Sequence, residues 1–415
     1  MANGRIQKPG QQQLPPPNPV AFNQYARLNR ANLATRSIAS VTATSGSVRL
    51  TPVDLPSVGY LFRAFNWFDL LMTVGDITSA RLRSNDDIAT TNLRFPAPWG
   101  FINRSRLSIN GSSDLWNMPG YESFLLMMAN NRGKKPLFGL DVFGSSTTGS
   151  RGYGSKEQMF ALTQQAGTSP LLTYTFLDMD SALTDSTNVN TKFMLAYPLT
   201  LGESAVAGLV PIQDYRVKPQ LEIEHLDVSA LVVNPTNVTL AGTMHTVCDY
   251  FEAPRGVRPD TRFVKQSRYQ TATMSGTGAQ AFAPQLGGVL LRTFISLWHG
   301  SATGTSQYAV NLEECVSDTR VVIQQNTQIE DIPPAFRAND ELRWYSKFMP
   351  NNVLSFDHVA SGFGDPGMPS LRERLESGRL TFLEYQWDQD VLTTAGEWRA
   401  VWEQLLPLPK IIPGA

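Results

Sequence analysis

The sequence passes twice through the same β-rich series of segments, and this duplication is the feature that most restricts its possible folds. Each half begins with dense apolar strands, continues into one short amphipathic helix and ends in a long aromatic strand. The predicted helix and closing strand are residues 118–130 and 238–251 in the first half, and 339–349 and 379–388 in the second. The pattern predicts two successive domains built on one β-scaffold.

Length and composition agree with two domains. The chain has 415 residues, more than one ordinary core accommodates and suited to two domains of about 150–200 residues each. Apolar residues make up 42% of the chain, whereas charged residues make up 17%, below the usual quarter. We therefore expect neighbouring molecules to cover much of the surface. The formal net charge of −1 disfavours a general nucleic-acid-binding surface.

The apolar segments of the first half predict strands. They are rich in β-branched and aromatic residues, and turn signals such as Asn110-Gly111 separate them. Loops of uneven length between many short strands are typical of a β-sandwich or jelly roll. The segments are residues 48–55, 60–71, 102–109, 171–177 and 193–201.

Composition divides the chain into five segments. An N-terminal arm, rich in Gln and Pro near its start, precedes the first β-domain. A polar linker then leads to the second β-domain and to a C-terminal arm. These segments are residues 1–47, 48–253, 254–284, 285–391 and 392–415.

The N-terminal arm is basic and has no acidic residue, because the first one in the chain is Asp54. A loosely amphipathic helix is predicted over residues 20–38, with Arg27, Arg30 and Arg36 in or near it. Such a segment favours an anionic partner, either lipid headgroups or phosphate. The alternative is a flexible, solvated tail.

The C-terminal arm is predicted to be an amphipathic helix. Residues 394–397 read Thr-Ala-Gly-Glu, which matches a capping box, and a proline ends the pattern at 407. Trp398, Trp402 and Leu405 would then share one face. Two tryptophans on such a helix need a groove, either on this chain or on a neighbour, and we expect this tail to anchor one subunit to another.

The sequence contains no recognisable catalytic pattern, so we expect no catalytic residues, no metal site and no cofactor. Residues 144–151 resemble a phosphate-binding loop but lack its Lys-Ser/Thr pair. Glu222, Glu224, His225 and Asp227 form the densest set of metal-ligand types, but successive strand residues point to opposite faces. Two distant carboxylates could still form a glycosidase pair, which leaves no local signature.

Three further features bear on the cellular compartment. Cys248 and Cys315 lie in apolar, strand-like segments, which predicts buried free thiols and a reducing folding compartment. The first residues lack the apolar core of a signal peptide. Residues 58–74 form the longest apolar run, which is too short and too polar to span a bilayer.

Several short matches resemble one known family. The first half contains Val58-Gly59 before a long strand, Ala97-Pro98-Trp99 before the next strand, and Met194-Leu-Ala-Tyr-Pro-Leu199. The second half contains Lys347-Phe-Met-Pro-Asn-Asn-Val353 and Phe356-Asp357-His358. In this layout the chain resembles the double jelly-roll major capsid proteins of tectivirus-like, membrane-containing icosahedral DNA phages. It departs from them in a longer insertion at 138–190 and in the tryptophan-bearing tail.

The resemblance implies an all-β fold of two consecutive eight-stranded jelly rolls, with short helices, an N-terminal arm and a C-terminal helix. It also implies a non-enzymatic virion protein, made in the host cytoplasm, that forms pseudo-hexagonal homotrimers. These would tile an icosahedral shell over an internal lipid membrane enclosing DNA. The implied partners are the chain itself, membrane lipids, and penton and minor capsid proteins, with no specific nucleic-acid sequence.

Two other functions remain open from the sequence. A two-domain jelly-roll protein could bind or hydrolyse glycans, for which Glu222, Glu224 and Asp178 are the candidate carboxylates. A phage tail or receptor-binding protein would usually contain a fibrous repeat, which the sequence does not show.

Overall fold

The computed structural model describes most of both β-domains. The described residues are 16–74, 81–82, 99–130, 138–144, 187–201, 208–214, 217–233, 236–274, 276–285, 287–299, 308–309, 312–324, 327–345, 349–350, 352–359, 380, 382–390 and 396–408. Within these ranges, no helix combines the length and the apolar character needed to cross a membrane.

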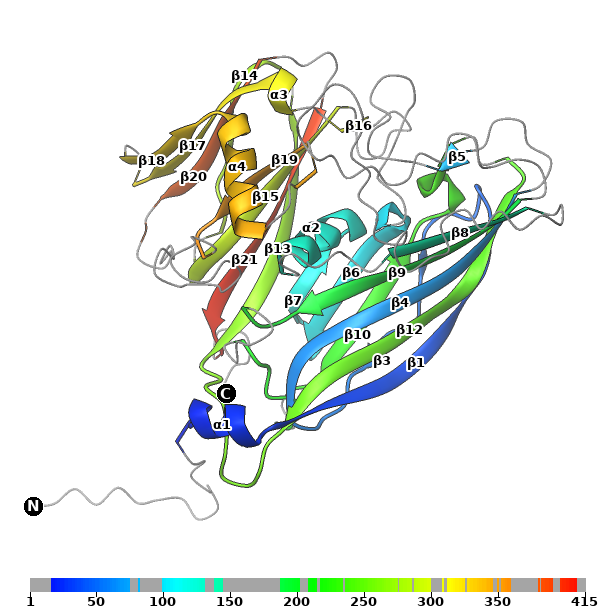
Figure 1. Ribbon diagram of the computed structural model, residues 1–415, viewed down its shortest axis with the longest axis vertical. Helices are drawn as coiled ribbons and strands as arrows, with labels where there is room; N and C mark the ends of the chain where they lie inside the picture. Colours follow the sequence, from blue (N-terminus) through cyan, green and yellow to red (C-terminus); the bar gives the residue numbers. More distant parts are fainter. Residues whose placement is uncertain are drawn as a thin grey trace, which may run out of the picture.

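The first barrel consists of two facing antiparallel sheets (Figure 1). One has the order β1 (Arg27–Val41), β12 (Val238–Glu252), β4 (Tyr60–Val74), β9 (Thr187–Pro198) and β8 (Phe138–Gly144). The other has the order β2 (Val48–Arg49), β10 (Pro219–His225), β6 (Ile102–Ile109) and β7 (Ser113–Met118), with β3 (Val53–Asp54) also paired to β10. A short ladder joins β5 (Arg81–Leu82) to β11 (Val232–Val233).

The second barrel repeats this arrangement. Its first sheet has the order β13 (Phe263–Met274), β21 (Gly396–Pro407), β15 (Val289–His299) and β16 (Tyr308–Ala309), and β19 (Val353–Asp357) also pairs with β15. Its second sheet has the order β14 (Gly278–Phe282), β20 (Leu383–Gln389), β17 (Val316–Ile323) and β18 (Thr327–Ile332).

Short helices complete the fold. They are α1 (Pro19–Tyr25), α2 (Gly120–Asn130), α3 (Leu312–Cys315) and α4 (Pro334–Tyr345), with 3-10 turns η1 (Trp99–Phe101) and η3 (Val228–Ala230). Helix α2 follows β7 in the first barrel, and α4 follows β18 in the second.

The two barrels correspond strand by strand. The order β1-β12-β4-β9 matches β13-β21-β15-β19, and β3-β10-β6-β7 matches β14-β20-β17-β18. Helices α2 and α4 occupy the same place in the series. The expected double jelly roll is thus confirmed, together with the first helix and the first closing strand. The second closing strand was predicted wrongly: it is β21, whereas residues 383–389 form β20, the counterpart of β10.

The core of the first barrel continues into the second. Phe68, Trp116 and Tyr197 are fully buried between the sheets of the first barrel, and the same apolar cluster includes α2 and Trp298 of the second. A separate cluster, which includes Trp387, fills the interior of the second barrel. Because α2 is buried between the barrels, the two domains form one packed unit (Figure 1).

The predicted helix over residues 20–38 is wrong beyond its first turns. Asn18 caps α1 by accepting a hydrogen bond from the Ala21 amide at 3.0 Å, and Pro19 suits the first helical position. The next residues form β1, which pairs with β12 along its length. Pairing with a long partner strand therefore outweighs a weak helical periodicity. The first barrel begins at Arg27, not at residue 48.

The predicted C-terminal helix is also wrong. Residues 396–407 form β21, which is hydrogen-bonded to β13 on one side and to β15 on the other. Likewise, the segment interpreted as a linker, 254–284, contains β13 and β14. The second barrel therefore spans 263–407 and not 285–391. Pairing on both edges overrides the capping-box signal, whose Glu397 instead forms an ion pair with Arg399 at 2.6 Å.

Candidate functional site: the junction and outer faces of the barrels

A buried ionic cluster lies on the face of β13, β21 and β15 that packs against the first barrel. Lys265 Nζ lies 2.8 Å from Glu403 Oε1. Arg292 Nε lies 3.4 Å from both Glu403 Oε2 and Asp357 Oδ2. All four side chains are almost completely buried, and burial lowers the pKa of Lys265 while Glu403 opposes that shift. These charged side chains can be buried because each one is paired with a charge of opposite sign, which offsets the cost of removing it from water.

Helix α2 connects the first barrel to this cluster and to residues on the same side of the second barrel. The Tyr121 hydroxyl donates to Asn352 Oδ1 at 2.9 Å, and its ring meets Trp298 edge-on with centroids 5.1 Å apart. At the other end of the helix, Asn130 Nδ2 donates to Glu403 Oε1 at 3.4 Å. Contacts at both ends of α2 fix its position against the second barrel.

A second charged pair also crosses the junction. Glu122 of α2 is fully buried, and its carboxylate lies 3.9 Å from the Arg399 guanidinium. Burial raises the pKa of Glu122, and Arg399 partly offsets this increase. Such buried charges add directional constraints more than net stability. We infer that they define how one barrel is oriented on the other.

Sequence reasoning missed this junction. The available signal was the presence of Lys265, Arg292 and Arg399 next to apolar residues within segments of strand-like composition. A charged residue within such a strand is costly to bury unless it is paired. The sequence does not reveal its partners, because Glu122 and Arg399 are 277 positions apart by their residue numbers (399 − 122).

Glu341 on α4 gives the second barrel a dependence on pH. Its carboxylate accepts hydrogen bonds from the Ser355 hydroxyl and from the Met349 amide, the latter at 2.9 Å. Burial nevertheless raises the pKa of Glu341 to about 7. A raised pKa means that the Glu341 carboxyl binds its proton more tightly in the folded state than in the unfolded state. Protonation of Glu341 therefore stabilises the fold fully below the unfolded pKa, and this stabilisation is lost as pH rises through 7.

We predict that Glu341→Gln removes this pH dependence. A shift of one pKa unit corresponds to about 1.4 kcal/mol, so the free energy of unfolding of the wild type should fall by about 2–3 kcal/mol relative to the variant between pH 4.5 and 8. Urea unfolding at both pH values measures it. Parallel pH profiles for the two proteins would contradict the assignment.

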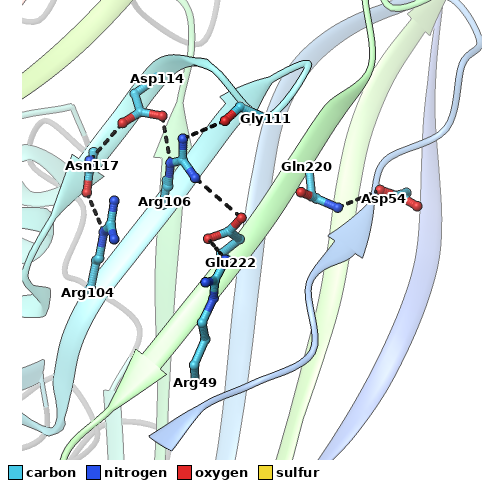
Figure 2. A network of polar contacts seen from close by, with 9 residues as sticks. All are labelled: Arg49, Asp54, Arg104, Arg106, Gly111, Asp114, Asn117, Gln220 and Glu222. Atoms are coloured by element: carbon cyan, nitrogen blue, oxygen red, sulfur yellow. Dashed lines mark hydrogen bonds and ion pairs between the residues drawn. The ribbon is translucent and has the colours of Figure 1, made fainter. Parts of the chain in front are cut away.

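In the first barrel, the outer face of the sheet formed by β2, β10, β6 and β7 carries a polar network centred on Arg106 (Figure 2). Arg106 Nε lies 2.7 Å from Asp114 Oδ1, and its NH1 lies 3.4 Å from Glu222 Oε1. Glu222 also pairs with Arg49 at 2.5 Å, and Asn117 donates to Asp114 at 2.7 Å. These bonds link β2, β10, β6 and β7, so the network stiffens the sheet.

The candidate metal ligands and carboxylates that the structure describes each have a structural partner. Glu224 accepts from Asn103 Nδ2 at 2.5 Å, whereas the His225 ring stacks on Phe101 and its pKa is lowered mainly by burial. Asp227 caps the turn η3. In the described part of the chain, no three His, Cys, Asp or Glu side chains are grouped to hold a metal. Asp178 and the loop 144–151 lie outside the described residues, except for Gly144 at its first position.

The three arginines of the predicted arm lie on one strand but not on one surface. Arg30 points to the outer face of β1 and forms a bidentate pair with Asp249, at 2.7 and 3.0 Å. Arg36 is paired across the ladder with the core residue Met244, and its guanidinium lies 3.4 Å from the Thr51 carbonyl. Arg27 is exposed at the start of β1. The structure does not gather them into one anion-binding site.

The predicted anchor residues of the tail lie inside the chain's own second barrel. Trp398 and Trp402 pack in its core around Phe282, and Leu405 lies in a neighbouring buried cluster. The groove that these side chains require is therefore on this chain, and their assignment as an inter-subunit anchor is corrected. Cys248 and Cys315 are free and buried, as predicted.

No protein-family model matches this sequence, and no curated protein is significantly similar to it. Solved structures do match. The crystal structure of the STIV major capsid protein aligns with a TM-score of 0.58 at 12% identity, over 92% of this chain and 98% of that chain. The structure of Sulfolobus Turreted Icosahedral Virus gives 0.57 at 12%, over 92% of each chain. The PBCV-1 virus capsid model gives 0.52 at 8%, over 92% and 93%. The chain has the fold of double jelly-roll major capsid proteins.

Proposed function

We propose that this chain is a viral major capsid protein that assembles as pseudo-hexagonal homotrimers into an icosahedral shell. The observation that carries the proposal is the repeated strand order of two barrels held as one packed unit. Three such chains present six barrels of similar shape, which can tile a surface hexagonally although the chain number is only three. The fold shared with viral capsid proteins supports the same role.

A trimer of this kind requires a fixed orientation between the two barrels of each chain, and the buried junction provides it. If the two barrels could swing relative to each other, the six corners of a trimer would not be equivalent. The ion pairs of Lys265, Glu403 and Arg292, with α2 packed between the barrels, hold the required orientation. The proposed role is structural, and Glu222 and Glu224, the carboxylates considered for glycan hydrolysis, serve in this proposal as partners for Arg49 and Asn103.

The first test is the mass of the purified chain in solution. One chain has a mass of 45.9 kDa, and light scattering is expected to give three times this value. Electron microscopy should show compact particles with a hexagonal outline. A monodisperse monomer at micromolar concentration would contradict the proposal.

We further propose that the shell encloses a lipid membrane and DNA, and that the α1 end of the first barrel faces the lipid. Val20 and Tyr25 of α1 are 66% and 65% exposed, and the basic residue Arg27 lies two positions after the helix. Apolar and basic side chains together suit an anionic membrane surface, where each Arg contributes about 1 kcal/mol. Penton and minor capsid proteins would complete such a shell.

The second test compares two surfaces of the first barrel. We expect the protein to float with anionic vesicles, Tyr25→Asp to abolish this binding, and Val48→Asp to retain it, because Val48 is exposed at the opposite end of the barrel. Retardation of duplex DNA without vesicle binding would assign the inner layer to DNA and refute the lipid contact. Equal vesicle binding by both variants would exclude α1 as the contact.

A further inference from the structure

Helix α2 places a fully buried carboxyl group in the junction between the two barrels. Glu122 lies in the first turn of α2 and is 0% exposed. Among the described residues, neither of its carboxylate oxygens accepts a hydrogen bond from another residue, and the Arg399 guanidinium, 3.9 Å away, is too distant to donate one. We propose that Glu122 controls a proton-dependent latch, which holds the two barrels together while Glu122 is protonated and weakens when Glu122 ionises.

Two carboxyl groups compete for one guanidinium at this point. Glu397 Oε1 lies 2.6 Å from Arg399 Nε, and it also accepts a hydrogen bond from the Thr271 hydroxyl at 2.6 Å. Glu397 is therefore the closer partner of Arg399, and Glu122 is the more distant one. One positive charge cannot neutralise both acids, so ionisation of Glu122 adds a negative charge that the buried site compensates poorly.

The other groups around Glu122 leave this imbalance in place. In the described part of the chain, Glu122 also interacts electrostatically with Tyr121 on α2 and with Tyr269 on β13. Burial raises the pKa of both phenols, and the charge of Glu122 raises it further, so both stay neutral. The positive charges of Lys265 on β13 and Arg292 on β15 pair with Glu403 in the neighbouring cluster.

The direction of the pH dependence follows from this environment. Burial raises the pKa of Glu122 above its ordinary value of 4.5, Arg399 opposes this increase, and Glu397 adds to it. Protonation therefore stabilises the closed junction fully below pH 4.5, and this stabilisation is lost as pH rises through the raised pKa. Between these two values, opening releases one proton, so its equilibrium constant increases about tenfold for each pH unit.

Opening acts on the contacts between α2 and the second barrel. Tyr121 adjoins Glu122 in the chain, donates to Asn352 Oδ1 at 2.9 Å and packs edge-on against Trp298. An ionised Glu122 is stabilised by reaching water, and the first turn of α2 cannot move toward water without withdrawing Tyr121 from these contacts. The two barrels then lose their fixed orientation. The latch thus adds a control of shape within one chain, beyond the proposed assembly.

Hydrogen exchange of the α2 amides tests the latch in the complete chain. Wild type and Glu122→Gln, which imitates the protonated carboxyl at every pH, are compared between about pH 5 and 9, with correction for intrinsic exchange rates. Protection of α2 in the wild type should fall about tenfold per pH unit over part of this range, whereas protection in the variant should stay constant. The same pH dependence in both proteins would refute the latch.

Glu341→Gln is the matched control, because it changes the other buried acid, on α4. This variant should keep the wild-type pH dependence at α2. If it abolished that dependence, α2 would exchange only through global unfolding, and a local latch would be refuted. The mass measurement that tests the trimer is a separate experiment, so either proposal can fail without the other.

Glu397→Gln provides a second variant in case Glu122→Gln does not fold. It removes the competing carboxylate, so the pKa of Glu122 should be lower than in the wild type. The pH range over which α2 loses protection should therefore become shorter, and α2 should remain better protected at high pH. An unchanged range in Glu397→Gln would refute the proposal by itself.

Discussion

Glu403→Gln is expected to lower the free energy of unfolding by about 3–5 kcal/mol, because it leaves buried positive charges without their partner. Glu403 pairs with both Lys265 and Arg292, and the side chains of all three are about 1% exposed. Asp357 would remain as an ion-pair partner of Arg292, but Lys265 would lose its carboxylate. Urea unfolding at fixed protein concentration measures the change.

The matched control is Asp260→Asn, which also converts an acid to its amide. Asp260 pairs with Arg262 at 2.6 Å, but Arg262 is strongly exposed, so water screens the interaction. We expect its unfolding free energy to remain close to that of the wild type. Equal destabilisation by the two substitutions would show that the buried junction has no special role in stability.

Trp402→Ala is expected to destabilise the isolated chain by about 3–5 kcal/mol, because it empties part of the second core. Trp402 is 3% exposed, and its ring centroid lies 5.3 Å from that of Phe282. Thermal and urea unfolding should both reveal the loss. If Trp402 acted instead as an anchor to a neighbour, the variant would keep wild-type stability and fail only in assembly.

Phe336→Ala provides the comparison, since Phe336 is a large aromatic residue exposed to solvent. An exposed substitution of this kind changes stability by about 0.5 kcal/mol or less. The pair of variants therefore separates a core aromatic residue from a surface aromatic residue within one barrel. Similar unfolding midpoints for both would contradict the position of Trp402 in the core.

The sequence predicted the β class and the duplication, because strands buried on one face leave a periodic signal, and the resemblance to a capsid-protein family implied the double jelly roll. It failed where pairing partners decide the structure. Residues 394–405 carry a helical signature, yet residues 396–407 form a strand because β13 and β15 offer two edges. The arginines of β1 likewise appeared as one cluster, whereas the ladder turns Arg30 and Arg36 to different faces. The junction was invisible for the same reason, since its charges come from segments far apart in sequence.

The strand order has a consequence for how the chain reaches this structure. In the first barrel, β12 lies between β1 and β4, although β12 is synthesised long after both; Arg30 and Asp249, which pair across this ladder, are 219 residues apart. In the second barrel, β21 enters in the same way between β13 and β15. Until its last strand is synthesised, each barrel therefore has two unpaired strand edges, one on each side of the position that this strand will occupy. Folding dominated by such distant pairings is slow and exposes edges that aggregate. The yield of assembled protein would then depend more on how well these incomplete sheets are protected from aggregation than on the stability of the folded barrels. Chaperones or rapid burial of α2 could provide that protection.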